Sequence, residues 1–535
     1  MTLVADLFDN TYVLQGVLVA VALVILSSFS RDLAHGLPYK NIPVVGRGNW
    51  EISNKKAKNR FMNSARELIM QGFEQGRTMF QVMFSFAPVI ILHPKYLNEI
   101  KSHPDLSFME ANKKAFFAGY PGFDAFSGTQ EDRVVIIDMI NKKLTQSLGP
   151  LAIPLSRETS DMLKKSLGEP KDWECHSFAE ELPYMVARIS SFIFMGDKIC
   201  RDEAWINVSV NYVIDAFIAA RDLRLWPSIL QPLVHWFLPR AKAMRKHIRV
   251  ARQIINEELE TRAKLGEKDA DRRRDTLDWM RDINEKQPLD IPRAQIGLSL
   301  AAIHTTSNLV TNVLYDLAAY PEYIQPLRDE IKAIMEEDGV LKKTSLTKMK
   351  MMDSVLKESQ RMNPVSMSKS SPPLHVFHDD ILTNAASLHR LASKDIRLSD
   401  GLTIPKGANM VVSAHTMTEE SVYPEANSYD GFRFYKIRQE PGQENKHQLV
   451  MASKDHLGFG YGVHACPGRF FASNEIKIIL THLLMKYDFK FAEEGRSRPK
   501  SFELGTEIVC DHRVKLLFKA RKPEIDLSCL GETSQ

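Results

Sequence analysis

The sequence has few cysteines and almost no net charge. Its 535 residues include five cysteines, and 70 Lys+Arg against 66 Asp+Glu leave a net charge of +4. No two cysteines form a CxxC pair, so the pattern fits neither a structural zinc site nor a disulfide scaffold. The small charge gives no reason to expect nucleic acid as a partner. The absence of a Gly-rich dinucleotide fingerprint and of a phosphate loop excludes a recognisable nicotinamide or flavin domain.

Only one long uncharged hydrophobic run occurs, at residues 12–29. Eighteen residues make roughly 27 Å of helix, enough to cross a bilayer core. The residues before the run are acidic (Asp6, Asp9), and the first basic residues follow it: Arg31, Lys40 and Arg47. This charge order predicts a lumenal segment 1–11, a transmembrane anchor 12–29, a Pro- and Gly-containing hinge 30–48 and a cytosolic body 49–535. A signal peptide and a buried core helix are the alternatives.

Beyond residue 60 the apolar residues mostly recur at helical spacing. We expect helices over residues 179–194, 206–221, 241–265 and 292–319, and short strands over 409–414 and 513–518. This pattern predicts a mainly α fold with a minor β region contributed by the second half of the chain. Hydrophobic residues make up 44% and charged residues 25%, which excludes a disordered chain and a multi-span membrane protein.

The most informative stretch is residues 459–469, which read FGYGVHACPGR. Its glycines allow a tight turn, and Pro467 suits the first turn of a helix, so Cys466 lies where a loop enters a helix. This motif resembles the haem-binding loop of the cytochrome P450 family. The resemblance implies haem b as cofactor, Cys466 as the axial thiolate ligand of its iron, and Phe459 and His464 as further cofactor-binding residues. It also implies the cytochrome P450 fold for the whole body.

The resemblance extends to a structural charge network. The family has a Glu-x-x-Arg pair on a helix, which Glu358 and Arg361 match, and the i, i+3 spacing puts both on one face. A second arginine closes the cluster in the family, and Arg433 matches it, with Gly431 where proline is usual. These three residues are expected to form a buried network that supports the haem.

A third match lies in the helix expected after Pro292. The family usually has Ala-Gly-x-Asp/Glu-Thr-Thr, and this chain reads AAIHTT from residue 301. The resemblance assigns Thr305 and His304 to proton handling during oxygen activation, with His304 in place of the usual acid. Ala302 replaces the glycine and narrows the groove beside the threonine.

The family also binds the haem propionates through cationic side chains. Arg390 and His464 match two such positions. The usual Trp-x-x-x-Arg motif on an earlier helix is absent, and the sequence offers Arg133, Lys142 or Lys143 as substitutes.

The resemblance implies a haem–thiolate monooxygenase of the fungal microsomal type, anchored in the endoplasmic reticulum membrane and supplied with electrons by an NADPH-dependent cytochrome P450 reductase. The expected substrate is an apolar small molecule such as a terpenoid or indole-terpenoid of secondary metabolism. The expected pocket residues are Leu298, Ala301, Ala302, Val365 and 504–506, and the reductase-docking cations are Lys454, Arg469 and Lys477. A haem–thiolate isomerase or dehydratase, and a non-catalytic haem-binding protein, remain alternatives.

One segment interrupts the resemblance. Residues 368–385, SKSSPPLHVFHDDILTNA, stand between the Glu-x-x-Arg helix and the strand that carries Arg390. Their codons can contain a splice donor, a branch-like sequence and an acceptor, and excision would remove 18 codons in frame. We therefore interpret 368–385 as a retained intron, with a genuine loop insertion as the alternative.

Overall fold

The computed structural model describes residues 15–16, 19, 36–51, 53–84, 87–265, 273–364, 386–504 and 507–532. The predicted lumenal segment, most of the predicted anchor and residues 30–35 of the predicted hinge lie outside these ranges. So do Val365, residues 505–506 and the suspected insertion 368–385. Among the described residues, no helix combines the length and the apolar character needed to cross a bilayer.

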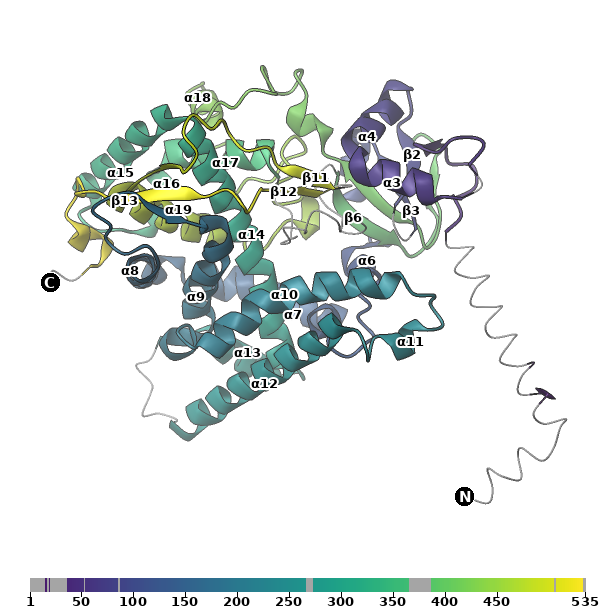
Figure 1. The fold of residues 1–535 in the computed structure, drawn as a ribbon, viewed down its shortest axis with the longest axis horizontal. Coiled ribbons are helices and arrows are strands. Elements are labelled where there is room, and N and C mark those ends of the chain that lie inside the picture. Colours follow the sequence, from purple (N-terminus) through teal and green to yellow (C-terminus); the bar gives the residue numbers. More distant parts are fainter. Residues whose placement is uncertain are drawn as a thin grey trace.

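Helices form most of the body (Figure 1). The described α-helices are α3 Lys55–Asn63, α4 Ala65–Glu74, α5 Leu97–Ile100, α6 Phe108–Ala115, α7 Gln130–Met139, α8 Leu148–Leu167, α9 Phe178–Ile199, α10 Glu203–Arg224, α11 Gln231–Val234, α12 Pro239–Leu265, α13 Thr276–Asn284, α14 Ile291–Ala319, α15 Ile324–Asp338, α16 Lys343–Lys348, α17 Lys350–Met362, α18 Arg433–Ile437 and α19 Arg469–Lys486. Each of the four stretches predicted from helical spacing lies within or largely within one of them.

The long helix α14 runs through the middle of the molecule (Figure 1). Its start is fixed by Asp290, whose side chain accepts the Arg293 N–H, and by Pro292 in the first turn. Most of its residues are buried all round, as expected of a helix enclosed by others. It packs against α9, α10, α12, α13, α17 and α19.

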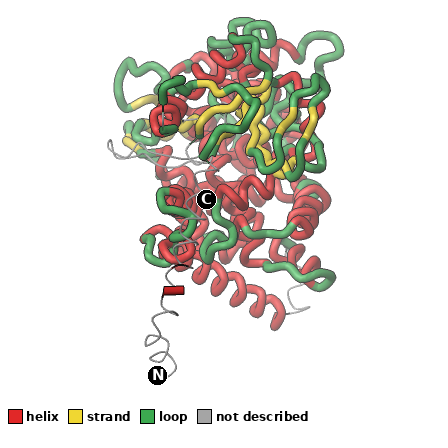
Figure 2. Tube along the Cα trace, turned by 90° about the vertical axis from the view of Figure 1, so that its right-hand side faces the viewer, coloured by secondary structure: helices red, strands yellow, loops and turns green. Residues whose placement is uncertain are grey.

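The strands gather in the upper part of the molecule in the view of Figure 2, and helices fill the lower part. The main sheet has the order β1-β2-β3-β9-β6-β4, formed by Val44–Val45, Met79–Met83, Pro88–Leu92, Asn409–Ser413, Ala386–Ala392 and Leu106–Ser107. Three smaller sheets contain β10 Tyr487–Phe491 with β13 Leu516–Ala520 and β5 Glu174–His176, β11 Phe502–Leu504 with β12 Glu507–Val509, and β7 Ile396–Arg397 with β8 Thr403–Ile404.

The main sheet corrects one expectation. Four of its six strands (β1 to β4) come from residues 44–107, so the β region is not contributed by the second half alone. All residues of β2 and β3 are buried. A strand that is covered on both faces has no period-2 alternation, and a short apolar run of that kind is not distinguishable from a helix segment by periodicity.

The main sheet also shortens the predicted hinge. Val44 and Val45 pair in parallel with Gln81 and Val82. The buried Gln81 side chain donates to the carbonyls of Tyr39 (2.8 Å) and Ile42 (2.7 Å) and accepts the Tyr39 N–H at 2.8 Å. The predicted hinge of residues 30–48 is therefore wrong from Tyr39 onward, because that part is tied into the folded body.

Candidate active site

Cys466 lies between the short 3-10 helix η7 (Gly462–His464) and the start of α19. Its backbone N–H donates to the Phe459 carbonyl at 2.8 Å, which closes the loop. Gly460 and Gly462 have φ of +71° and +75°, and a Cβ at Gly462 would lie 2.8 Å from the Lys101 carbonyl oxygen. Glycine is thus required at 462 by both conformation and space.

Burial and neighbouring groups shift the pKa of the Cys466 thiol in opposite directions. Burial raises the pKa of Cys466, whereas hydrogen bonds from the backbone of Gly468 and Arg469 and the Arg469 charge lower it; burial dominates. The Arg469 guanidinium also donates to the Cys466 carbonyl at 2.7 Å. The start of α19 thus offers N–H donors to a thiolate, as the sequence predicted. These donors do not outweigh burial, so the thiolate form depends on the positive charge of a bound metal ion.

Three cationic or potentially cationic side chains converge beside this loop. Arg133 on α7 lies 2.9 Å from the His464 ring nitrogen Nδ1, and both Arg133 and Arg390 stack on Phe108, at 5.7 and 5.5 Å from its ring centre. Burial and the neighbouring Arg390 and Arg133 charges lower the pKa of His464 to about 4. Burial and Arg133 lower the pKa of Arg390 to about 10. The positive charges of Arg133 and Arg390 therefore repel each other and disfavour protonation of His464, in a place shielded from water.

This cluster fits the carboxylates of a haem. The Arg390 Nε is buried without a hydrogen-bond partner among the described residues, and no acid side chain pairs with Arg133 or Arg390 in the ion pairs of that part of the chain. Arg390 is buried and Arg133 half-buried, and two such guanidiniums without a counter-charge among the described residues are costly unless a ligand supplies the anions. Of the three candidate substitutes, Arg133 is the one placed here. Lys142 is exposed and pairs with Asp138 at 2.5 Å, and Lys143 is exposed.

The strand β6 aims Arg390 through an irregularity. The register between β6 and β9 shifts between Ser387 and Arg390, and Leu388 has a φ of +55°. A bulge of this type redirects the side chains that follow it. Arg390 and His389 are consequently buried, with Arg390 donating to the His389 carbonyl at 2.7 Å.

Helix α14 presents one accessible stripe in an otherwise buried helix. Ala301 is exposed, and four further residues are half-buried: Gly297, Leu298, Ala302 and Thr305. Their spacing places them on one face. The Thr305 hydroxyl donates to the Ala301 carbonyl at 2.7 Å, with the Ala302 carbonyl at 3.3 Å. The stripe thus gives an apolar wall with one hydroxyl, and it contains the predicted pocket residues Leu298, Ala301 and Ala302.

His304 is not brought to this stripe. Its Nε2 lies 3.0 Å from the Val210 carbonyl of α10, and the ring is buried. The side chain of His304 therefore belongs to the α10–α14 packing, on a different face from Thr305. The structure gives the pair no shared hydrogen bond through which His304 would act as the proton relay that the sequence suggested.

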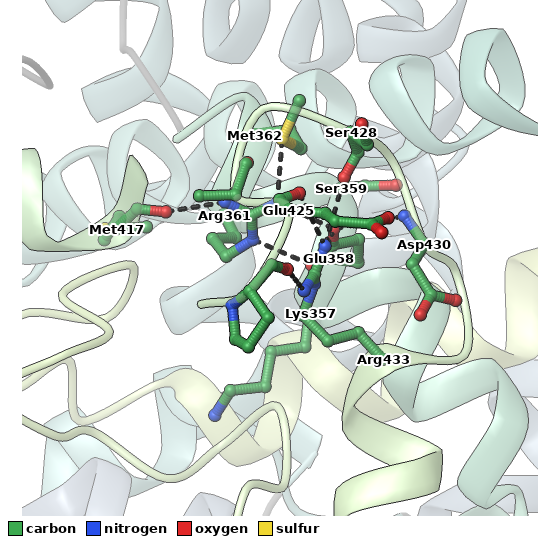
Figure 3. Close-up of polar contacts among 12 residues, drawn as sticks. Lys357, Glu358, Ser359, Arg361, Met362, Met417, Glu425, Ser428, Asp430 and Arg433 are labelled. Carbon is green, nitrogen blue, oxygen red and sulfur yellow. Dashed lines mark hydrogen bonds and ion pairs between the residues drawn. The ribbon is translucent and has the colours of Figure 1, made fainter. Parts of the chain in front are cut away.

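The structure brings Glu358, Arg361 and Arg433 together in one buried network (Figure 3). Arg361 donates to both Glu358 oxygens at 2.7 and 2.8 Å, and Arg433 donates to Oε1 at 3.2 Å. Arg361 also donates to the carbonyls of Met417 and Ala426, and Arg433 to those of Pro424, Glu425 and Ser428. Helix α17 is thereby bound to the loop that precedes α18.

Sequence reasoning missed a buried acid on α19. Glu475 is fully buried and accepts hydrogen bonds from Ser190 at 2.6 Å and from Thr306 at 3.4 Å. Burial raises the pKa of Glu475 to about 8, so the carboxyl is mainly protonated at neutral pH. An acid within a helix gives no local signal of burial, and its partners lie on α9 and α14.

The prediction that Lys477 helps to dock the reductase is wrong. Its ammonium group is buried, pairs with Asp353 at 2.7 Å and donates to the Leu346 carbonyl at 2.9 Å. Lys477 is therefore unavailable to a partner protein. Arg469 is half-buried and engaged with Cys466 and Val450, whereas Lys454 is exposed.

Comparison with known proteins adds independent evidence. The family model described as Cytochrome P450 matches residues 38–374 and 382–513. A cytochrome P450 monooxygenase of Penicillium ochrochloron, ptmU, is 36% identical over 498 residues, covering 92% of this chain and 94% of that protein. The Aspergillus fumigatus cytochrome P450 monooxygenase pyr3 is 37% identical over 492 residues, covering 90% of each chain. The Aspergillus oryzae cytochrome P450 monooxygenase hepE is 39% identical, covering 84% of this chain and 81% of its own.

The glycine-bounded cysteine loop, the uncompensated cations beside it and the accessible stripe around Thr305 all fit a thiolate-bound haem. Combined with matches over most of the sequence, they show that this chain belongs to the cytochrome P450 family and is a haem-dependent monooxygenase.

Proposed function

We propose that this enzyme hydroxylates, or oxidises in successive steps, an apolar small molecule, and that the substrate is a terpenoid or indole-terpenoid intermediate of fungal secondary metabolism. The observation that carries the proposal is the accessible stripe of α14, where small and apolar side chains surround the single hydroxyl of Thr305. Such a wall favours a hydrocarbon skeleton and offers no charged group to bind an ionic substrate.

The roles of the residues follow from their placement. Haem, when bound, supplies the activation of dioxygen and its insertion into a C–H bond. Cys466 provides the thiolate ligand, and Arg133, Arg390 and His464 hold the carboxylates. Thr305 offers its oxygen as a hydrogen-bond acceptor on the substrate side, because its own proton is directed to the Ala301 carbonyl.

The experiment that tests the haem–thiolate assignment is the spectrum of the reduced, carbon-monoxide-bound protein. We expect the long-wavelength Soret band of a thiolate-bound haem in the full-length protein and its loss in Cys466→Ser. Cys175→Ser is the matched control, because Cys175 is exposed and forms no disulfide in the structure. A folded, haem-loaded protein without the band would contradict the proposal.

Two other functional classes, an isomerase or dehydratase and a non-catalytic haem-binding protein, predict different results in a turnover experiment. A haem–thiolate isomerase or dehydratase needs no external electrons, so its turnover would persist without NADPH and would survive Thr305→Ala. A non-catalytic haem-binding protein would show the thiolate band but would consume no NADPH in the presence of reductase. Product analysis with and without NADPH in a host that makes candidate terpenoids separates all three.

We propose an NADPH-dependent flavoprotein reductase as the electron donor, docked on the thiolate side of the molecule. Arg133 of α7 contacts His464, and the Lys101 ammonium lies 4.8 Å from the centre of the Tyr461 ring, so both cations lie beside the cysteine loop. Val463 in that loop has 68% of its surface exposed. An exposed apolar side chain with cations beside it suits an acidic partner surface.

We also propose that the enzyme is held on the cytosolic face of the endoplasmic reticulum membrane. The uncharged run 12–29 supports an anchor, and the connection from α10 to α12 supports a second contact. Six large apolar side chains are exposed there: Leu225, Trp226, Leu230, Leu233, Trp236 and Phe237. An exposed cluster of this kind marks an interaction surface, and tryptophan suits the bilayer interface.

A further inference from the structure

A line of polar residues runs along one face of α14 beyond Thr305. Asn308, Asn312 and Asp316 follow it at intervals of three, four and four residues, which places all four on one face. Asn308, Asn312 and Asp316 are all buried, in a helix whose other buried residues are largely apolar. Burying amides and a carboxyl costs free energy unless each polar group is bonded, so their partners show what the line is for.

From Arg498 toward Asn308 the hydrogen bonds along this line run in one direction, and the Ser359 hydroxyl also donates to Asp316 at 2.6 Å. Arg498 donates to the Asn312 Oδ1 at 2.8 Å and to the Asp316 carboxyl at 2.5 Å. Asn312 in turn donates from Nδ2 to the Asn308 side-chain oxygen at 3.2 Å and to its backbone carbonyl at 2.9 Å. A chain of amides that begins at a cation is polarised along its length, so its last N–H is a strengthened donor.

That last donor is the Asn308 Nδ2. It is buried, with 8% of the residue exposed, and it has no hydrogen-bond partner among the described residues. The carboxamide directs Oδ1 toward Asn312 at the C-terminal side, which leaves Nδ2 pointing away from Asn312, and Thr305 lies three residues toward the N-terminus on the same face. Leaving a buried N–H unpaired costs free energy, and a water molecule that accepts from it removes that cost.

Thr305 is the matching acceptor. Its hydroxyl proton is directed to the Ala301 carbonyl, so its oxygen retains free lone pairs. Thr305 is half-buried on the accessible stripe, whereas His304 is bonded to Val210 on another face. A water that accepts from Asn308 and donates to Thr305 would satisfy both groups.

We propose that Asn308 is a positioning residue that holds an ordered water beside Thr305, and that Arg498 polarises it through Asn312. The inference rests on the proposed oxygen-activating function. Electrons from NADPH through the reductase can reduce dioxygen in two ways: O2 + 4H⁺ + 4e⁻ → 2H2O breaks the O–O bond, and O2 + 2H⁺ + 2e⁻ → H2O2 leaves it intact. A positioned water beside Thr305 delivers the additional protons that favour the first.

The balance between these two reactions requires no known substrate. With full-length enzyme, reductase, NADPH and oxygen, water formation consumes two NADPH per O2 and peroxide formation consumes one. We expect Asn308→Leu and Arg498→Met to lower the water-to-peroxide ratio at least about tenfold, the order of loss caused by a displaced positioning group. Arg498→Lys keeps a cationic donor and should restore much of the ratio. An unchanged ratio in Asn308→Leu would overturn the inference.

A second readout is structural and independent of turnover. Crystals of the wild-type enzyme should show an ordered water within hydrogen-bond distance of the Asn308 Nδ2 and the Thr305 oxygen, and crystals of Asn308→Leu should lack it. A protein or haem atom bonded to Nδ2 in place of water would also overturn the inference.

The controls separate this inference from the proposed function. Asn211→Leu removes a half-buried α10 asparagine that bonds its i−4 carbonyl at 3.0 Å, and it should leave the ratio unchanged. The carbon-monoxide band should be normal in every variant. If the wild type lacks that band, the proposed function fails. If the band is normal and Asn308→Leu keeps the ratio, only the role of Asn308 fails. Should Asn308→Leu not fold, Arg498→Met and the wild-type crystal decide.

Discussion

The buried network around Glu358 makes a sharp prediction for a single residue. Glu358→Ala would leave the Arg361 and Arg433 guanidiniums buried without their shared carboxylate. Breaking a buried ion pair by removing one partner costs roughly 3–5 kcal/mol, so we expect a loss of that order in the free energy of unfolding, measured in urea on the solubilised enzyme.

A matched control exists at the surface. Glu493 pairs with Arg496 at 2.6 Å on the same i, i+3 spacing, but its side chain is 70% exposed. Glu493→Ala should change stability little, because exposed pairs are screened by water. Equal losses in the two variants would show that burial does not decide the strength of the Glu358 network.

Glu475 predicts a pH dependence of stability. Burial raises the pKa of Glu475 to about 8 from its ordinary value of 4.5. Since the folded protein retains this proton and the unfolded chain loses it, the contribution to stability is complete below pH 4.5 and declines as pH rises toward 8. Glu475→Gln mimics the protonated group and does not titrate. Its stability relative to wild type should therefore increase with pH, by up to roughly 1.4 kcal/mol per unit.

The measurement compares urea unfolding of both proteins at pH 5 and pH 8. Glu493→Gln serves as the exposed control and should show no such trend. A stability difference between Glu475→Gln and wild type that is the same at both pH values would mean that Glu475 is ionised in the folded protein.

Single residues also show where sequence reasoning stops. Cys466 and the Glu358–Arg361 pair were predictable, because their motifs are local. The choice of Arg133 over Lys142 and Lys143 was not, because it depends on a contact with His464 across 331 residues of chain. The Glu475 and Asn308 environments were missed for the same reason, and Lys477 was misjudged because closeness in sequence to Cys466 says nothing of burial.

Among the secondary-structure elements, helices were the more predictable. Helical spacing located α9, α10, α12 and α14 to within a few residues, because each has an apolar face or is apolar all round. Strands β1 to β4 were missed. β3 pairs with β9 and β4 with β6, more than 270 residues later, so no local pattern signals those two pairings. β1 pairs with β2 and β2 with β3, but β2 and β3 are buried on both faces and therefore lack the alternation that marks a strand.

The interpretation of residues 368–385 as a retained intron can be tested on the transcript and on the protein. The match to the Cytochrome P450 family model is interrupted between residues 374 and 382, inside this segment. We expect the mature transcript to lack these 18 codons, and we expect a chain without them to show a larger carbon-monoxide band per milligram than the chain with them. Sequencing the transcript checks the first expectation. A mature message that retains the codons would establish a genuine loop insertion.

For the whole molecule, the exposed apolar side chains predict how the body meets a bilayer. Leu233 and Phe237 are 60% and 66% exposed on the α10–α12 connection. If this connection enters the membrane, Leu233→Ser with Phe237→Ser should reduce the quenching of tryptophan fluorescence by brominated lipids in full-length enzyme, because Trp226 and Trp236 would move outward. Burial of each large apolar side chain contributes roughly 1.5–3 kcal/mol.

Val340→Ser provides the control, since Val340 is exposed on a different part of the chain, after α15. Its quenching should equal that of the wild type. If the double serine variant is quenched as strongly as wild type, the connection does not contact lipid.

The hydrogen bonds between Gln81 and residues 39–45 have a practical consequence for expressing this protein without its apolar N-terminal segment. The carboxamide of Gln81 is buried, and two of its three bonds end on the carbonyls of Tyr39 and Ile42. A soluble expression version that begins after Ile42 would leave that buried amide without its two carbonyl partners. Shortened or chimeric versions should therefore begin no later than Pro38, with any purification tag placed ahead of it.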